Sequence, residues 1–253
     1  MIIQKSDGAY LYATTDLATI KYRMKEWDAD EILYVVDHRQ SEHFQKLFAV
    51  ANAWNASAVK LHHISFGTVL DENGRPYKTR SGDAVGLEGL LDEAVRKAFE
   101  VVSANDDGKP NGPDLDEATR NHIADVVGHG AIKYADLSHN RTSDYVFSYD
   151  KMMALEGNTA TYMQYCYARV QSIFRKGGIE MADLRRSPQA IVLSHDAERA
   201  LAMLLLRYSE ALENVLDEYR PNQLTNYLFD LAKRFSSFFE QCPVLKAEDE
   251  AVK

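Results

Sequence analysis

The first hundred positions alternate between short apolar runs and segments with helical spacing of apolar residues. Residues 31–36 form a nearly continuous apolar run (Glu-Ile-Leu-Tyr-Val-Val), which is typical of a strand that a parallel sheet buries on both faces. Shorter strands are predicted over residues 9–12 and 59–65. Helices are predicted over residues 14–27 and 41–54, and Thr14 is expected to cap the first of them. Because strands and helices alternate, we expect a doubly wound parallel sheet. It begins at Met1 without an opening strand–helix unit, as if cut from a longer chain.

The pattern becomes purely helical in the second part of the chain. Residues 71–76 are a turn cluster, residues 85–102 have helical spacing, and residues 105–113 are predicted to form an exposed loop because they are rich in Asp, Gly, Asn and Pro. Further helices are predicted around residues 123–137, 155–173 and 195–218, and a last one begins near Pro221. We therefore expect an α/β domain over residues 1–113 and an all-α helix bundle over residues 114–253, truncated in its acidic tail.

Composition and charge exclude little. Of the 253 residues, 45% are apolar and 26% charged, as in ordinary globular proteins. No apolar run is long enough to span a bilayer, and the N-terminus lacks the pattern of a signal peptide. The net charge of −9 argues weakly against a nucleic-acid partner, although a local basic patch can override the sum. Cys166 and Cys242 have neither disulfide-framework nor metal-ligand spacing, so we predict a cytoplasmic protein without a bound metal.

Three segments of the first domain are similar to arginyl-tRNA synthetases. They are residues 6–18 (SDGAYLYATTDLA), residues 34–44 (YVVDHRQSEHF), and residues 66–69 (FGTV) followed by 78–83 (KTRSGD). In the helical part, residues 156–159 (EGNT), 162–165 (YMQY) and 168–169 (AR) resemble the DALR-type anticodon-binding domain of the same family. The resemblance spans nearly the whole chain. It implies the C-terminal half of a class I, Rossmann-type catalytic domain, followed by most of a helical anticodon-binding domain.

The resemblance implies the activity of an arginine–tRNA ligase, which forms arginyl-adenylate from L-arginine and ATP and transfers arginine to tRNA(Arg). ATP would be a co-substrate, with Mg²⁺ accompanying it, and the parent protein would be a monomer. Selective binding of a guanidinium requires planar acceptors that include a carboxylate, and the family places its arginine-pocket side chains at Tyr12, Asp16 and Gln40.

The other site residues also follow from the resemblance. ATP contacts are expected from His43 and from the backbone of Phe66, Gly67, Thr68 and Val69. The catalytic loop, which departs from the KMSKS consensus, offers Lys78 and Arg80, and the residue that contacts phosphate is open. tRNA contacts are expected from Asn158, which we predict to cap a helix, and from Tyr162, Tyr165 and Arg169, which share one helical stripe and suit stacking on unpaired bases.

Each of these residues also has a purely structural interpretation. Tyr12 fits an alternating strand, Asp16 the first turn of a helix, and Gln40 a loop that precedes one. Lys78 and Arg80 fit a solvated loop, His43 a structural position, and tyrosines at helical spacing usually belong to the core or its boundary.

Two other functions remain open. The HIGH-type motif, the other ATP-binding signature of class I enzymes, is absent from the chain, so we expect that the chain alone does not activate arginine. The missing half-site motivates a noncatalytic RNA-binding module as one alternative. A different class I synthetase, such as the cysteinyl type, is the other, but that enzyme needs zinc ligands that do not cluster in this sequence.

Overall fold

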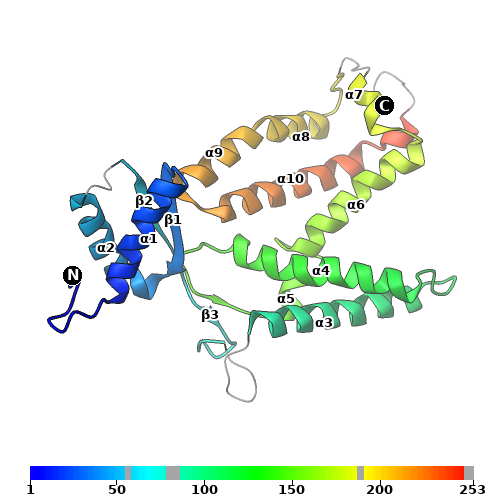
Figure 1. The fold of residues 1–253 in the computed structure, drawn as a ribbon. Helices are drawn as coiled ribbons and strands as arrows, with labels where there is room; N and C mark the ends of the chain where they lie inside the picture. The colour runs from blue at the N-terminus through cyan, green and yellow to red at the C-terminus, as the bar shows by residue number, and fades with distance from the viewer. Residues whose placement is uncertain (55–57, 78–85, 187–190, 248–253) are drawn as a thin grey trace. The chain divides into compact units, whose positions relative to one another are not determined.

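The computed structural model describes residues 1–54, 58–77, 86–186 and 191–247 (Figure 1). The chain packs as two compact units, one of Met1–Leu70 with Arg141–Tyr145 and one of Asp71–Asn140 with Val146–Lys253. The expected domain boundary after residue 113 stays a prediction. No helix in the described ranges is both long enough and apolar enough to cross a membrane.

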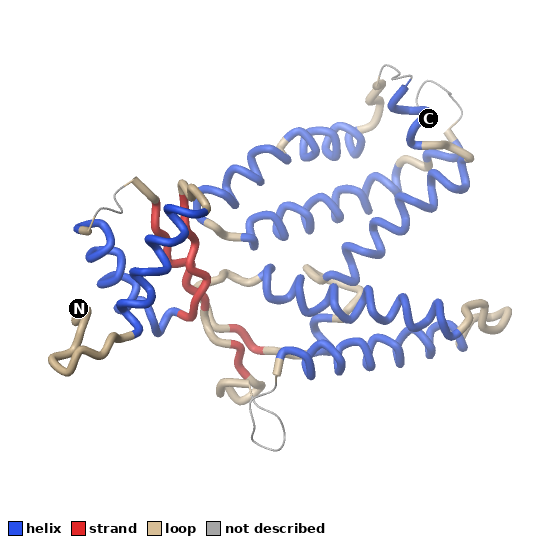
Figure 2. The backbone as a smooth tube through the Cα atoms, viewed as in Figure 1, coloured by secondary structure: helices blue, strands red, loops and turns tan. Residues whose placement is uncertain are grey.

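The first unit contains a parallel pair of strands with helices packed on it. Its elements are α1 (Tyr12–Glu26), β1 (Glu31–Asp37), the 3₁₀ helix η1 (His38–Gln40), α2 (Ser41–Ala53), β2 (Lys60–Phe66) and β3 (Val69–Leu70). β1 and β2 pair in parallel register from Glu31↔Lys60 to Asp37↔Phe66 (Figure 2). The core forms where α1 meets α2, from Leu17, Ile20, Phe44, Leu47 and Ala51. The predicted β1, α2 and β2 are confirmed, with ends that shift by one residue.

Two predictions for the segment around the start of α1 are wrong. Residues 9–12 are no strand: only an isolated bridge joins Gln4 and Tyr10, and α1 begins at Tyr12 with Leu11 as its N-cap. Thr14 therefore lies inside α1, where its hydroxyl donates to the carbonyl oxygen of Ile3 instead of capping the helix. The Ala-Tyr-Leu-Tyr run also buries no face, since Tyr10 and Tyr12 are 67% and 88% exposed.

Only one face of β1 is buried in the described part of the chain. Ile32 lies in the core, and Tyr34 and Val36 pack against α1 and α2 on the same face. Leu33 and Val35 point the other way and are 45% and 64% exposed. The expectation of burial on both faces is thus wrong for the described residues, among which none buries the side chains of Leu33 and Val35.

The second unit is helical, as predicted. Its elements are α3 (Leu87–Asp107), α4 (Glu117–Ser138), α5 (Tyr149–Met152), α6 (Ala160–Gly177), α7 (Met181–Arg186), α8 (Asp196–Leu206), α9 (Tyr208–Glu218), α10 (Pro221–Gln241) and η2 (Val244–Lys246). The short β4 (Tyr145–Val146), whose first residue Tyr145 belongs to the first unit, pairs with β3 of that unit. Pro221 occupies the first turn of α10, as expected. The helix predicted over residues 195–218 is interrupted at Arg207 and forms α8 and α9.

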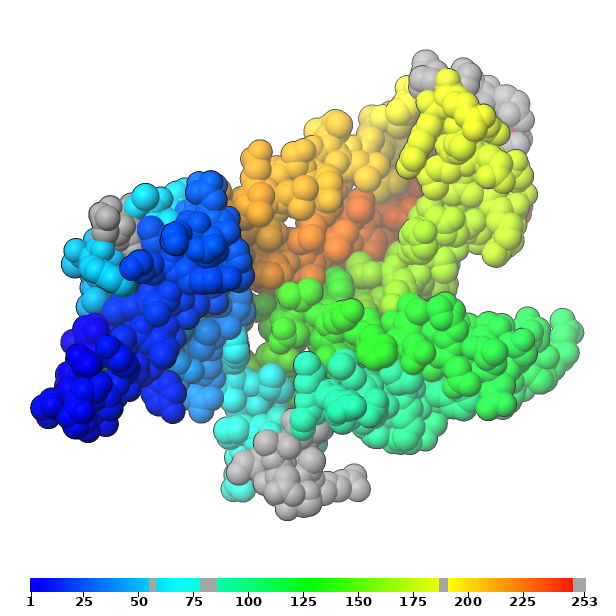
Figure 3. All heavy atoms as spheres, in the orientation of Figure 1, coloured from blue at the N-terminus to red at the C-terminus, as the bar shows by residue number. Residues whose placement is uncertain are grey.

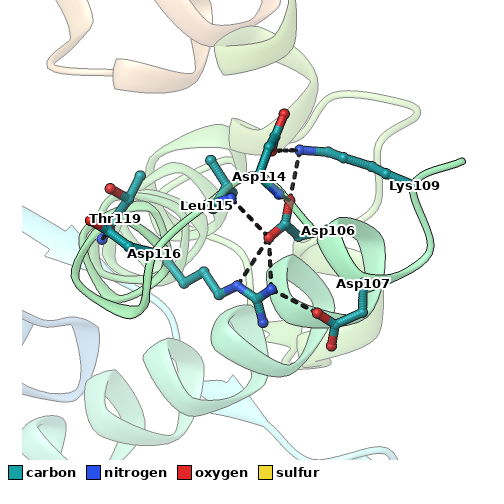
Figure 4. A network of polar contacts seen from close by, with 8 residues as sticks. Asp106, Asp107, Lys109, Asp114, Leu115, Asp116 and Thr119 are labelled. Atoms are coloured by element: carbon teal, nitrogen blue, oxygen red, sulfur yellow. Dashed lines mark hydrogen bonds and ion pairs between the residues drawn. The ribbon is translucent and has the colours of Figure 1, made fainter. Parts of the chain in front are cut away.

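α3 and α4 form an antiparallel hairpin whose atoms lie against each other (Figure 3). The predicted exposed loop over residues 105–113 is confirmed for residues 108–113. Its start is wrong, because α3 continues to Asp107 and Asp106 is only 1% exposed. The Asp106 carboxylate accepts hydrogen bonds from the backbone N–H groups of Asp114 and Leu115, both at 3.2 Å (Figure 4). It also pairs with Lys109 and Arg120, each at 2.7 Å. A buried carboxylate that accepts this many donors closes the turn between the two helices.

Candidate functional site

The carboxyl ends of β1 and β2 meet at one edge of the sheet. β1 ends at Asp37 and β2 at Phe66, and these two residues are register partners. Nδ1 of His38, the first residue after β1, lies 3.3 Å from the carbonyl oxygen of Phe66 and thus links the two strand ends. In open parallel sheets, ligands bind outside this edge. The predicted pocket residue Gln40 and the predicted ATP segment 66–69 both begin there.

A bidentate ion pair between Arg39 and Asp37 stabilises the turn that follows β1. Arg39 donates from Nε and Nη2 to the two carboxylate oxygens of Asp37, at 2.8 and 2.7 Å, and its backbone N–H also donates to Asp37 Oδ1. These hydrogen bonds hold the pKa of Asp37 well below its usual range. Gln40 ends this turn with an exposed side chain. The sequence pattern gave no role to Asp37, His38 or Arg39, although they lie inside a segment that carries the family resemblance.

The structure brings together two residues that were predicted separately. Asp16 lies in α1 and His43 in the first turn of α2, and His43 Nε2 is 2.8 Å from Asp16 Oδ2. The side chains are 39% and 33% exposed. Tyr12 lies one turn before Asp16 on α1, so both project from the same face of the helix. With a ring that is 88% exposed, Tyr12 is available to a ligand.

Tyr34 belongs to the same electrostatic environment as Asp16. Tyr34, on β1, packs its ring against Phe44 at a centroid distance of 5.0 Å. Burial raises the pKa of the Tyr34 hydroxyl, Arg23 opposes this shift, and the negative charge of Asp16 adds to it. The Tyr34 phenol therefore stays protonated at neutral pH.

The segment 66–69 is held by a stretch of chain that sequence reasoning missed. Gly67 donates its N–H to the carbonyl oxygen of Arg141 at 2.9 Å, and the Thr68 N–H donates to Asp144 Oδ1 at 2.6 Å. A Cβ at position 67 would lie 2.4 Å from the Ser143 carbonyl oxygen, so this close approach requires glycine. The polar run Asn-Arg-Thr-Ser-Asp after the end of α4 is the one sequence signal that marks residues 140–144.

These contacts bear on the expected adenine site. The N–H groups of Gly67 and Thr68 already donate within the protein, and the carbonyl oxygen of Thr68 accepts from the N–H of Tyr145 at 3.2 Å. Contacts from this segment to adenine stay a prediction.

The predicted catalytic residues Lys78 and Arg80 lie outside the described residues. The turn that precedes them is described and confirms the prediction for residues 71–76. Asp71 Oδ1 accepts from the N–H groups of Asn73 and Arg75, both at 2.9 Å, and Gly74 adopts a φ of +73°.

A groove of about 740 Å³ in the first unit contains none of the predicted site residues. It follows α1 and the end of α2, and its walls include the apolar side chains of Leu17, Val50 and Trp54. The side chains of Lys21, Lys25 and Glu26 also border the groove, but most of its lining is apolar and offers a guanidinium or a phosphate few hydrogen-bonding partners. The edge at His38 and the pair Asp16–His43 form the better candidate site.

In the helical unit, two of the four predicted tRNA-binding residues make contacts between helices. Asn158 accepts a hydrogen bond from the Tyr134 hydroxyl at 2.6 Å, and burial raises the pKa of Tyr134 to about 12. Asn158 is not the predicted cap: Thr159 is the N-cap of α6, and its hydroxyl accepts from the N–H of Tyr162. The Tyr162 hydroxyl lies 3.2 Å from Ser236 Oγ on α10.

The other two residues form a partly exposed cation–aromatic cluster with Phe239. The Arg169 guanidinium lies 4.8 Å from the ring centroid of Tyr165 and 4.5 Å from that of Phe239. Tyr165 is 45% exposed. An aromatic ring beside a guanidinium offers a stacking surface for a nucleobase. The residues predicted to share one stripe of α6 therefore have different surroundings. Tyr162 faces α10, whereas Tyr165 and Arg169 reach the surface.

The described ranges contain no cluster of three or more His, Cys, Asp or Glu side chains that could hold a metal ion.

Comparison with known proteins gives consistent matches over the whole chain. Residues 1–149 match the family of class I (R) tRNA synthetases, catalytic domain, and residues 163–253 match the DALR anticodon binding domain. The chain is 54% identical over 260 residues to the arginine–tRNA ligase of Rhodopirellula baltica and 49% identical over 254 residues to that of Shewanella denitrificans. These alignments include 100% and 99% of the chain but 39% and 42% of the two ligases, so the chain spans about two-fifths of the length of these curated relatives.

Solved structures of arginyl-tRNA synthetases match the same chain length. The arginyl-tRNA synthetase of Plasmodium falciparum matches 99% of the chain with a TM-score of 0.82 at 31% identity, over 41% of its own length. That of Thermus thermophilus matches 100% of the chain with a TM-score of 0.82 at 29% identity, over 46% of its length.

Proposed function

Because the chain belongs to the class I (R) family of tRNA synthetases, we propose that it supplies the arginine-binding edge and the anticodon-binding helices of an arginine–tRNA ligase. The observation that carries the proposal is the position of Asp16. Its carboxylate lies on the face of α1 that also bears the exposed Tyr12, and one of its oxygens is fixed by His43 at 2.8 Å.

The proposed reaction has two steps. The carboxylate of L-arginine attacks the α-phosphorus of ATP, the bond to pyrophosphate breaks, and arginyl-adenylate forms. A hydroxyl at the 3′ end of tRNA(Arg) then attacks the carbonyl carbon, and AMP leaves. Little covalent work falls to the protein, so positioning and charge stabilisation provide most of the acceleration.

The side chains of this chain would divide that work by chemistry. Asp16 would accept from the guanidinium of arginine, and Tyr12 and Gln40 would offer neutral oxygens to its other N–H groups. Lysine lacks the planar fork of donors, so it would leave some of these acceptors unpaired. The backbone of Phe66–Val69 would border adenine, and a cation from Lys78 or Arg80 would meet the phosphates, with Mg²⁺ arriving bound to ATP.

The helical unit would bind the anticodon region of tRNA. Tyr165 and Arg169 present a ring and a guanidinium at the surface of α6, which suits stacking on the unpaired bases of a loop. Asn158 and Tyr162 would act mainly by fixing α6 against its neighbours. The proposed enzyme would act as a monomer in the cytoplasm.

A chimera tests the proposal in a complete ligase. The segment of the Rhodopirellula baltica enzyme that matches this chain is replaced by the chain itself, and attachment of each of the twenty amino acids to bulk tRNA is measured. We expect attachment of arginine alone and a loss of at least a hundredfold in kcat/KM for arginine in Asp16→Asn. A folded chimera that attaches no amino acid but still binds tRNA would favour the noncatalytic RNA-binding module.

A further inference from the structure

The contact between Asp16 and His43 joins two rigid positions. Asp16 precedes Leu17, which is 5% exposed, and His43 precedes Phe44, which is 6% exposed. Both buried neighbours belong to the core between α1 and α2. Since this packing fixes the backbone on either side, the 2.8 Å contact between His43 Nε2 and Asp16 Oδ2 is set by the fold rather than by a loop.

The pair leaves half of the carboxylate available. In the described part of the chain, Asp16 Oδ2 is the oxygen that contacts His43, and Oδ1 has no hydrogen-bond partner. The His43 ring packs edge-on against Phe44, with centroids 5.4 Å apart and planes at 78°, which restricts its rotation. Nε2 of His43 is therefore directed at Asp16.

From this arrangement we infer that His43 is a positioning residue for Asp16: its Nε2–H holds Oδ2 so that Oδ1 faces the guanidinium of the substrate. The inference rests on the proposed function and assigns His43 to the arginine side of the site, whereas the family resemblance implied a position near ATP. A carboxylate held by a hydrogen bond from its own protein loses less rotational freedom when the substrate binds.

The steady-state kinetics of the chimera test the inference. His43→Phe keeps a ring against Phe44 and removes the N–H, whereas His43→Gln retains an amide N–H close to the position of Nε2. We expect His43→Phe to raise KM for arginine roughly tenfold, the value of one lost charge-assisted hydrogen bond, with KM for ATP within twofold of the unsubstituted chimera. His43→Gln should restore KM for arginine to within about threefold.

A matched control uses the same substitution elsewhere. His122 is exposed on α4, so His122→Phe should leave both KM values unchanged. If His43→Phe does not fold, His43→Asn replaces it, because the shorter amide of Asn does not reach Asp16.

The outcomes separate the two proposals. An unsubstituted, folded chimera that attaches no arginine would refute the proposed function. An active chimera in which His43→Phe raises KM for ATP and spares KM for arginine would overturn only the positioning role. The positioning role would also be overturned if the Gln and Phe variants behaved alike.

Discussion

The close approach of α3 and α4 predicts that a single added methyl group at Gly128 destabilises the hairpin. A Cβ at this position would lie 2.7 Å from both Cα and N of Val95 and 2.8 Å from the carbonyl carbon of Ala94. All three are backbone atoms of α3, which cannot rotate away. The buried apolar residues of both helices are alanines, at most 7% exposed: Ala94, Ala98, Ala124, Ala131 and Ala135.

The magnitude follows from two opposing effects. Carbon atoms pack at about 3.5–4.0 Å, so Gly128→Ala must separate the helices locally by roughly 1 Å. Overpacking of a core costs about 1–3 kcal/mol, and a backbone obstacle places this site in the upper part of that range. Replacing glycine by alanine inside a helix recovers about 1 kcal/mol. We therefore expect a net loss of about 1–2 kcal/mol in the free energy of opening the hairpin.

Amide hydrogen exchange measures this loss locally, which matters because a chain of two units does not unfold in a single two-state transition. A change of about 1–2 kcal/mol corresponds to exchange that is about five- to thirtyfold faster in peptides from α3 and α4. Peptides from α1 and α2, which belong to the other unit, should be unchanged and provide an internal reference.

Gly130→Ala is the matched control, two residues further along α4. Its Cβ would meet Gln164 Nε2 at 2.7 Å, the end of a flexible side chain that donates to the Val126 carbonyl oxygen at 3.1 Å. Losing that hydrogen bond costs about 1 kcal/mol, and the gain in helix propensity of about 1 kcal/mol offsets it. If Gly128→Ala exchanged no faster than Gly130→Ala, the argument from close backbone packing would be refuted.

Three further predictions concern other contacts. Burial would raise the pKa of Asp106, but hydrogen bonds, first of all from Lys109, lower it overall; its stabilisation is therefore present above about pH 4 and lost as the pH falls. The melting temperature of Asp106→Asn should accordingly lie below that of the unsubstituted chain at pH 7, and the difference should shrink towards pH 3. Thr159→Ala removes the N-cap of α6 and should cost about 1 kcal/mol, detected as faster amide exchange in the first turn of α6. Tyr165→Ala in the chimera should weaken binding of a tRNA(Arg) transcript by roughly 5- to 100-fold if the ring stacks on a base, whereas Tyr165→Phe should bind normally.

Much of the fold could be predicted because many of its helices and strands are determined by local sequence patterns. A few residues suffice to predict β1 from its apolar run. The same holds for α2, which follows from the helical spacing of Phe44, Leu47 and Ala51. The start of α10 at Pro221 depends on the fixed φ of a single residue. Local patterns of this kind can be recognised in a sequence without knowing which other segments the element packs against.

What could not be predicted depends on contacts between distant residues. Turn-forming composition correctly indicated a turn after α3, but the burial of Asp106 depends on Arg120, fourteen positions further along the chain. The Phe66–Val69 segment is held by Asp144, seventy-six positions away from Thr68. A propensity scale has no information about either partner. The strand predicted over residues 9–12 failed for the opposite reason: the local pattern was apolar, but no neighbouring strand pairs with it in the described chain.

The predicted site residues followed from the family resemblance, and three of them share a structural feature. Asp16, His43 and Tyr165 each lie next to a core residue on an amphipathic helix, namely Leu17, Phe44 and Cys166. The periodicity that identifies the buried neighbour also identifies the polar residue that the helix presents at its boundary. The contact between Asp16 and His43 could not be predicted in this way, because it depends on how α1 and α2 are rotated against each other. That rotation is set by the packing of Leu17 and Ile20 against Phe44 and Leu47, so the core between the two helices determines the geometry of the carboxylate that we propose to bind arginine.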